Sequence, residues 1–175
     1  MAGTTLALAL LLGGTSPGLV PQPMLTTAER RILHAHNAER ERVGVSALQW
    51  DAGLAASAAS YGPALASAGR LSHSPRDSRP GQRENLWMGT RGAYSPEEMV
   101  GSWIAEKSLL RPGTYPAVSA TGRWEDVSHY TQLVWPTTTR VGCAVHSNAT
   151  WDYLICRYSP PGNRDGLAIP VAWLR

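Results

Sequence analysis

The chain has 175 residues, 43% of them hydrophobic and 17% charged, which is the composition of one globular domain rather than of a disordered chain. The formal net charge is only +3, and the basic residues are spread along the sequence instead of forming a run. These features give no support for a nucleic-acid-binding protein, and we expect no nucleic-acid partner.

The first segment along the chain is a short apolar run, Leu6–Leu12, which is followed by small and turn-forming residues. It is too short to span a bilayer and resembles the hydrophobic region of a secretory signal peptide. We therefore expect a signal peptide at 1–20, a linker at 21–25 and one domain at 26–175, secreted to the periplasm or the cell exterior. The alternative is a disordered N-terminal extension. No later segment resembles a transmembrane helix, so the protein is not expected to span a membrane.

Two helices are predicted next. The sequence TTAE at 26–29 is a capping box, which predicts a helix that ends near Arg42. Asp51 is a good N-cap for a second, alanine-rich helix at 52–68, and Pro63 is expected to kink this helix or to end its first half. Histidines at 34 and 36 diverge on the first helix, so we interpret His36 as a hydrogen-bonded packing residue rather than a metal ligand.

A polar loop follows from Leu71 to Arg83, with His73 and Glu84 at its edges. Long polar loops of this kind often carry function, although solvated surface residues would give the same pattern. The sequence SPEE at 95–98 then predicts the start of a third helix, with the proline at the first helical position and acidic residues in the first turn. Glu106 lies one turn after Trp103 and can border the apolar face of this helix.

The C-terminal part is predicted to be β-structure. The segment Ser128–Trp135, SHYTQLVW, is rich in aromatic and β-branched residues and is followed by Pro136, which predicts a strand with His129 at its beginning. Two more strands are expected at about 140–146 and 152–158. Helices that precede a run of strands indicate an α+β fold in which the helices cover a mainly antiparallel sheet.

The chain has two cysteines, Cys143 and Cys156, on two segments that are both predicted to be strands. They are expected to be cross-strand neighbours, and in an exported protein they would form a disulfide. Two buried free thiols are the alternative. No additional cysteine or histidine stands at the spacing that a zinc site on this pair would need.

Several motifs together resemble one family. They are HNAER at 36–40, LQWDAGLAASAASYG at 48–62, LSHS at 71–74, ENLW at 84–87, WIAEK at 103–107, SHYTQLVW at 128–135 and YLICRYSPPGN at 153–163. These blocks resemble the superfamily of cysteine-rich secretory proteins, antigen 5 and plant pathogenesis-related 1 proteins (the CAP superfamily, whose domain is also called SCP), in its compact, single-domain bacterial form. Two positions depart from the pattern: Ser128 replaces the usual glycine, and the loop SPRDSRPGQR at 74–83 is longer than in plant relatives.

The resemblance implies a three-layer α-β-α sandwich with a central cleft and a disulfide between Cys143 and Cys156. It also implies that the cleft holds a tetrad of two histidines and two glutamates. In the family the histidines are the usual direct ligands of a divalent cation such as zinc, and the glutamates assist. By this correspondence the tetrad is His73, Glu84, Glu106 and His129. A hydrogen-bonded cluster that only braces the cleft is the alternative, and Glu125 is a rival to Glu106.

From this resemblance we expect a secreted, noncatalytic, monomeric binding domain for a lipid, a sterol or another small hydrophobic ligand, or for a partner protein. The alternative is a metal-dependent, protease-like hydrolase that uses Glu84 or Glu106 as general base. The sequence contains no GxSxG motif, so a serine nucleophile of that type is not expected.

Overall fold

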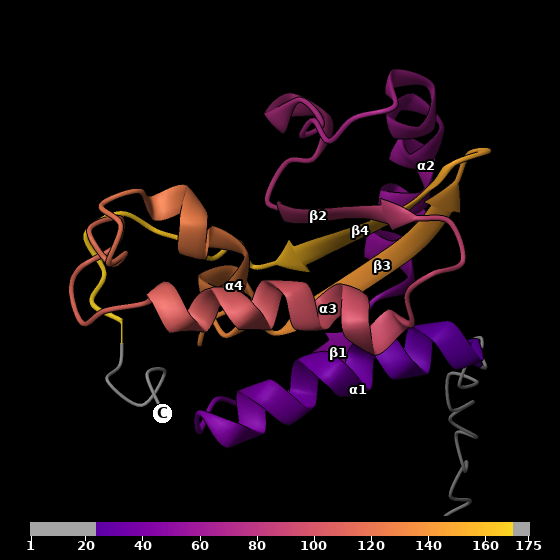
Figure 1. Cartoon of the computed structure of the whole chain (residues 1–175). Coiled ribbons are helices and arrows are strands. Elements are labelled where there is room, and N and C mark those ends of the chain that lie inside the picture. The colour runs from indigo at the N-terminus through magenta and orange to yellow at the C-terminus, as the bar shows by residue number, and fades with distance from the viewer. Residues whose placement is uncertain (1–23, 170–175) are drawn as a thin grey trace, which may run out of the picture.

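The computed structural model describes residues 24–169 (Figure 1). The predicted signal peptide, most of the predicted linker and the last six residues of the predicted domain lie outside this range. The helices and strands are α1 (Thr27–Arg42), β1 (Gln49–Trp50), α2 (Ala52–Ala68), β2 (Arg83–Thr90), α3 (Pro96–Ala105), α4 (Ser128–Leu133), β3 (Arg140–Ser147) and β4 (Trp151–Ser159). Within residues 24–169, no helix combines the length and the apolar character that crossing a membrane requires.

The four strands form one sheet in the order β1-β3-β4-β2. Strand β4 pairs antiparallel with both β2 and β3, whereas the short β1 pairs parallel with β3, so the sheet is mixed rather than purely antiparallel. Helices α1 and α3 lie on one side of the sheet and α2 on the other (Figure 1). The predicted α+β fold with three layers is therefore confirmed.

Strand β4 is buried along almost its whole length because helices cover both faces of the sheet. Leu154, Cys156 and Tyr158 face the larger core, which also contains Trp103 of α3. Tyr153 and Ile155 point the other way, into a smaller core beneath α2. Strand β4 therefore joins the two apolar layers of the fold.

The ends of the first two long helices agree with the sequence signals. The side chains of Thr26 and Glu29 form the predicted capping box at the start of α1. Asp51 accepts a hydrogen bond from the backbone N–H of Leu54 at the start of α2, and Gly69 ends that helix in the left-handed conformation. Helix α2 continues through Pro63, so of the two predicted effects of this proline, an end of the first half of the helix does not occur.

Cys143 and Cys156 are directly opposite each other in the register of β3 and β4 and form a disulfide. Both side chains are buried in the larger core. The bond closes a separation of 13 residues across the hairpin that these two strands make.

Strand β2 was not predicted, since Arg83, Glu84 and Asn85 at its start have the composition of a loop. The side chains of Glu84 and Asn85 are nevertheless buried, and both are held by hydrogen bonds within the protein. These polar side chains form hydrogen bonds inside the fold, so their presence does not indicate an exposed loop.

The prediction of a strand at Ser128–Trp135 is also wrong, because residues Ser128–Leu133 form the helix α4. Tyr130, Thr131, Gln132 and Leu133 are all buried, so the aromatic and β-branched residues that favour a strand serve here to fill the core around a short helix. The alternation of faces expected for a strand does not apply. In the helix, His129 and Leu133 are four residues apart and lie along the same side.

Charged side chains from distant parts of the chain bind both ends of α4. Glu106 accepts hydrogen bonds from the backbone N–H groups of His129 and Tyr130, at 3.0 and 3.1 Å. At the other end, the buried guanidinium of Arg40 donates to the carbonyls of Leu133 and Trp135, at 2.8 and 3.1 Å. The two amides and the carbonyl of Leu133 are backbone groups that a helix leaves without partners, so the two charges stabilise a helix at this position.

Arg40 also donates to two further carbonyls, those of Ser46 and Thr138. Burial lowers its pKa to about 10, which still leaves the side chain charged at neutral pH. Arg40 therefore fastens α1 to α4 and to the two loops that follow these helices.

Helix α2 packs directly onto β3 at Gly142. A Cβ atom at this position would overlap the backbone of Asp51, Leu54 and Ala55. Glycine is therefore required here by the close approach of the helix to the strand.

We expect Arg40→Met to lower the free energy of unfolding by at least about 3 kcal/mol, because the substitution leaves several buried carbonyl groups without donors. Arg123→Met is the control, since Arg123 is 72% exposed and forms only a surface ion pair with Asp126. Urea unfolding of both variants measures the difference. Equal stability of the two variants would show that Arg40 does not hold α4.

Candidate functional site

A cleft of about 740 Å³ opens at the end of the sheet where α4, the start of β2 and the loop before β2 meet. Its wall includes three members of the predicted tetrad, which are His73, Glu84 and His129. The other residues of the wall are Ser74, Arg76, Arg79, Arg83, Asn85, Tyr115, Pro116, Trp124, Ser128, Gln132, Asn163, Arg164 and Asp165.

The first histidine of the cleft is paired with the first glutamate. Nδ1 of His73 lies 2.9 Å from Oε1 of Glu84. The His73 side chain is 54% exposed, whereas that of Glu84 is fully buried. Glu84 therefore orients the imidazole of His73 through Nδ1, and the Nε2 atom of that ring makes no bond to Glu84. Histidines that bind metals are commonly supported by a carboxylate in this way.

Glu84 has more partners than this histidine. Its carboxylate accepts hydrogen bonds from the backbone N–H and the hydroxyl of Ser74, and Nη2 of Arg157 lies 3.1 Å from Oε2. Burial alone would raise the pKa of Glu84, but the hydrogen bonds from His73 and Ser74 and the charge of Arg79 outweigh it, so the pKa is lowered. A carboxylate in this environment stays ionised and is a weak base.

The second histidine is paired with the second glutamate in the same way. Nδ1 of His129 lies 2.5 Å from Oε1 of Glu106, whose other oxygen accepts the two α4 amides described above. The ring of His129 also stacks on Trp103, with 6.0 Å between the centroids and 16° between the planes. Glu106, rather than its rival Glu125, is therefore the carboxylate that binds His129, and it orients the ring and caps the helix at once.

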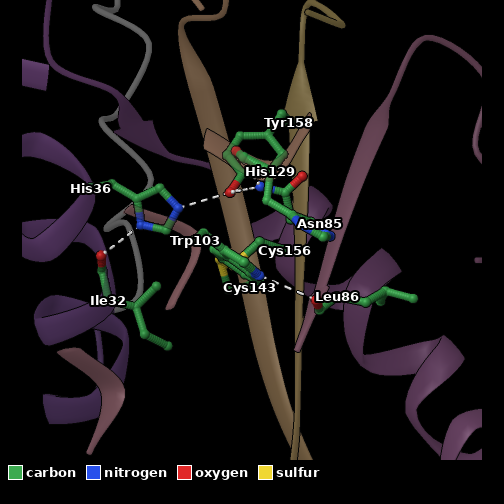
Figure 2. The surroundings of a disulfide bond; sticks show 9 residues. All are labelled: Ile32, His36, Asn85, Leu86, Trp103, His129, Cys143, Cys156 and Tyr158. Atoms are coloured by element: carbon green, nitrogen blue, oxygen red, sulfur yellow. Dashed lines mark hydrogen bonds between the residues drawn. A yellow bond between two sulfur atoms is a disulfide. The ribbon is translucent and has the colours of Figure 1, made fainter. Parts of the chain in front are cut away.

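A buried hydrogen-bonded network connects this side of the cleft to the core (Figure 2). Nδ2 of Asn85 donates to the carbonyl of His129 at 3.0 Å and to the hydroxyl of Tyr158 at 3.2 Å. Tyr158 in turn lies 2.8 Å from Nε2 of His36, and Nδ1 of His36 lies 2.8 Å from the carbonyl of Ile32. Because a carbonyl only accepts, Nδ1 of His36 carries the proton and Tyr158 donates to Nε2.

His36 is consequently neutral, and the interpretation of it as a hydrogen-bonded packing residue is confirmed. Its side chain is fully buried. Burial lowers its pKa from 6.5 to about 4. Asn85, by contrast, was missed as a site residue, and its position beside Glu84 in the ENLW block was the one signal in the sequence that pointed to it.

The structure brings the tetrad together as two His–Glu pairs. Among residues 24–169, no group of three or more histidine, cysteine, aspartate or glutamate side chains is close enough to hold a metal ion. Each of the two cleft histidines has its Nδ1 atom paired with a glutamate, so Nε2 is the ring nitrogen that could bind a cation. Water or a bound ligand would have to complete such a coordination shell.

Comparison with known proteins identifies the family of this chain. Residues 33–158 match the family described as "CAP: Cysteine-rich secretory protein family". The chain belongs to this CAP family. It is 40% identical over 134 residues to the "Pathogenesis-related protein PR-1 type" of Sambucus nigra, an alignment that covers 75% of each chain. It is 36% identical over 137 residues to "Pathogenesis-related protein 1" of Arabidopsis thaliana, with 78% of each chain covered.

Solved structures of lower sequence identity share the CAP fold. The structure described as "Crystal structure of NaASP2 with Zn2+" superposes with a TM-score of 0.69 at 22% identity, and covers 85% of this chain and 87% of its own. The structure of Na-ASP-1 gives a TM-score of 0.71 at 22% identity, and the match covers 87% of this chain and 45% of that one. At 22% sequence identity, these two superpositions show a shared fold and do not by themselves indicate a shared function.

We expect the neutral His36 to make the CAP domain less stable as the pH falls. Its pKa is lower in the folded than in the unfolded chain, so the unfolded state binds the extra proton below about pH 6.5 and stability is lost toward pH 4. Between pH 7 and pH 5 this loss is about 2 kcal/mol. Urea unfolding at both pH values should show a pH dependence in the wild type that is absent in His36→Gln.

The control for this prediction is His34→Gln on the same helix, since His34 is exposed. It should keep the pH dependence of the wild type. The same dependence in His36→Gln would show that another group causes it.

Proposed function

We propose that this protein is an exported, noncatalytic binding domain of the CAP family, and that its central cleft is one of its two binding sites. The observation that carries the proposal is that the carboxylates of Glu84 and Glu106 are both already engaged in hydrogen bonds within the protein. Both carboxylates are used to position a histidine and to bind backbone or arginine groups, and neither is available as a base. Export is supported by the apolar run near the N-terminus and by the disulfide in the core.

In this proposal His73 and His129 bind a divalent cation through Nε2, while Glu84 and Glu106 hold the rings in place. The supporting observation is that each histidine has its Nδ1 atom fixed by a carboxylate, which is the arrangement found behind many metal-bound histidines. Zinc is the first cation to test, since Zn2+ accompanies one of the solved structures that share the fold. When bound, the cation would supply an electrophilic centre to which a ligand oxygen could attach.

The hydrolase alternative has less support from the same contacts. A general base must have a free lone pair within reach of the attacking water. The lowered pKa of Glu84 makes it a poor proton acceptor, and Glu106 already accepts from three N–H groups of α4. We therefore propose that the cleft binds a ligand and does not catalyse hydrolysis.

A hydrophobic ligand is favoured by a different surface of the molecule. An apolar groove of about 700 Å³ lies between the start of α1, the first half of α2 and β3, and alanines of α2 form much of one wall. Its size and lining suit the chain of a fatty acid or the rings of a sterol. We propose this groove as the site for such a ligand.

The proposed cation site is tested by zinc titration calorimetry on protein that has first been treated with a chelator. We expect saturable binding in the wild type that disappears in His73→Ala/His129→Ala, because that variant lacks both proposed ligands. The matched control is His34→Ala/His146→Ala, which removes two histidines outside the cleft wall and should still bind. Absence of zinc-dependent heat in the wild type, or equal loss in both variants, would rule out the cation site.

The apolar groove is tested by displacement of a fluorescent fatty acid with palmitate. Ala56→Trp should weaken binding at least about tenfold, since the indole would fill space that the ligand needs. Ala64→Trp introduces the same side chain on an exposed position of α2 outside the groove and should leave binding unchanged. If both variants bind like the wild type, the groove is not the site.

A further inference from the structure

The wall of the cleft carries more positive charge than its own carboxylates balance. Four arginines and two acidic residues line it: Arg76, Arg79, Arg83, Arg164, Glu84 and Asp165. Glu84 is already bound by Arg157, which lies outside the wall, and it is only 3.9 Å from Arg79. Little of its charge therefore remains to offset the other arginines, and the cleft has a net positive potential.

Two of these arginines are fixed by neutral groups. Arg79 donates from Nε to the Ser74 hydroxyl at 2.9 Å and from Nη1 to the Gln82 carbonyl at 3.2 Å, and its side chain is only 7% exposed. Arg83 donates to the carbonyls of residues 162 and 163, both at 3.2 Å. Carbonyl and hydroxyl groups orient a guanidinium but do not cancel its charge. The charge of Arg83 is therefore held in place for a partner, whereas that of Arg79 is partly offset by Glu84.

The arginines are also close enough to repel one another. Burial is the main cause that lowers the pKa of Arg83, and the charge of Arg76 adds to it. Burial likewise lowers the pKa of Arg79, against the opposing effect of Glu84 and with the help of Arg157. An anion bound among these groups would relieve both the repulsion and the cost of burial.

Aromatic side chains lie in the same cleft. Trp124 is 43% exposed, and the centroid of its ring lies 6.2 Å from that of Tyr115 in an edge-to-face arrangement. The cleft, at about 740 Å³, is also much larger than a bare oxyanion. These features fit a ligand that carries an organic part as well as a charged group.

We propose that the cleft binds a small phosphorylated ligand, with the phosphate group held by Arg76, Arg79 and Arg83 and the organic part against Trp124. A phosphate ester fits this wall better than a carboxylate, because it brings more negative charge and three oxygens for several guanidinium groups. A free phosphorylated metabolite and the headgroup of an anionic lipid share this chemistry. The inference rests on the proposed role of the cleft as a binding site, but it does not depend on the cation.

The test is titration calorimetry with inorganic pyrophosphate in the presence of EDTA, so that no divalent cation contributes. Arg76→Ser/Arg83→Ser removes two of the three charges proposed to hold the phosphate, and neither side chain has a carboxylate partner within 4 Å among residues 24–169. We expect it to weaken binding roughly fivefold to tenfold. The control, Arg70→Ser/Arg111→Ser, changes the net charge equally at exposed positions outside the wall and should bind like the wild type.

Absence of pyrophosphate binding to the wild type, or equal weakening in both double variants, would overturn the proposal whatever the result of the zinc titration. The source of the phosphate is decided by flotation with vesicles of phosphatidylcholine containing phosphatidic acid. Wild-type protein that binds pyrophosphate but not these vesicles takes a soluble ligand, and protein that binds both takes a lipid headgroup. Equal binding to vesicles of pure phosphatidylcholine would count against recognition through the anion.

Discussion

Helix α4 is held at both ends by charges from elsewhere in the chain, and the candidate site depends on this arrangement. Glu106 binds the N–H groups of the first turn, and Arg40 binds the carbonyls that follow the last. The carboxylate that caps the helix also fixes the ring of His129. The position of one cleft histidine is thus determined by the same contact that makes its segment helical.

This dependence explains which parts of the structure could be predicted from the sequence. The capping box at Thr26 and the N-cap at Asp51 are local signals, and the helices that they predict are present. For α4 the decisive partners stand 23 and 93 residues away, so its local preference for a strand gave the wrong result. Strand β2 was missed for a related reason, because Glu84 and Asn85 resemble loop residues until their buried partners are known.

The resemblance to the family identified the four tetrad residues, but the sequence could not show how they pair or what surrounds them. The structure gives each glutamate to one histidine, so the carboxylates act as supports and the imidazoles face the cleft. It also gathers arginines that are separated along the chain. The positive potential of these arginines arises because they lie close together in the fold, and neither the composition nor the net charge of the chain reveals this. The cleft wall therefore combines two histidines, each positioned by a glutamate, with a group of arginines.

The close contact at Gly142 bears on how this domain can evolve. Since α2 rests on the backbone of β3 without an intervening side chain, that layer cannot accept larger residues without shifting a whole helix. Sequence change is absorbed more easily in the loop at 74–83, which is largely exposed and supplies three arginines of the cleft wall. Substitutions in that loop can therefore change the charge of the cleft wall without disturbing the contact between α2 and β3.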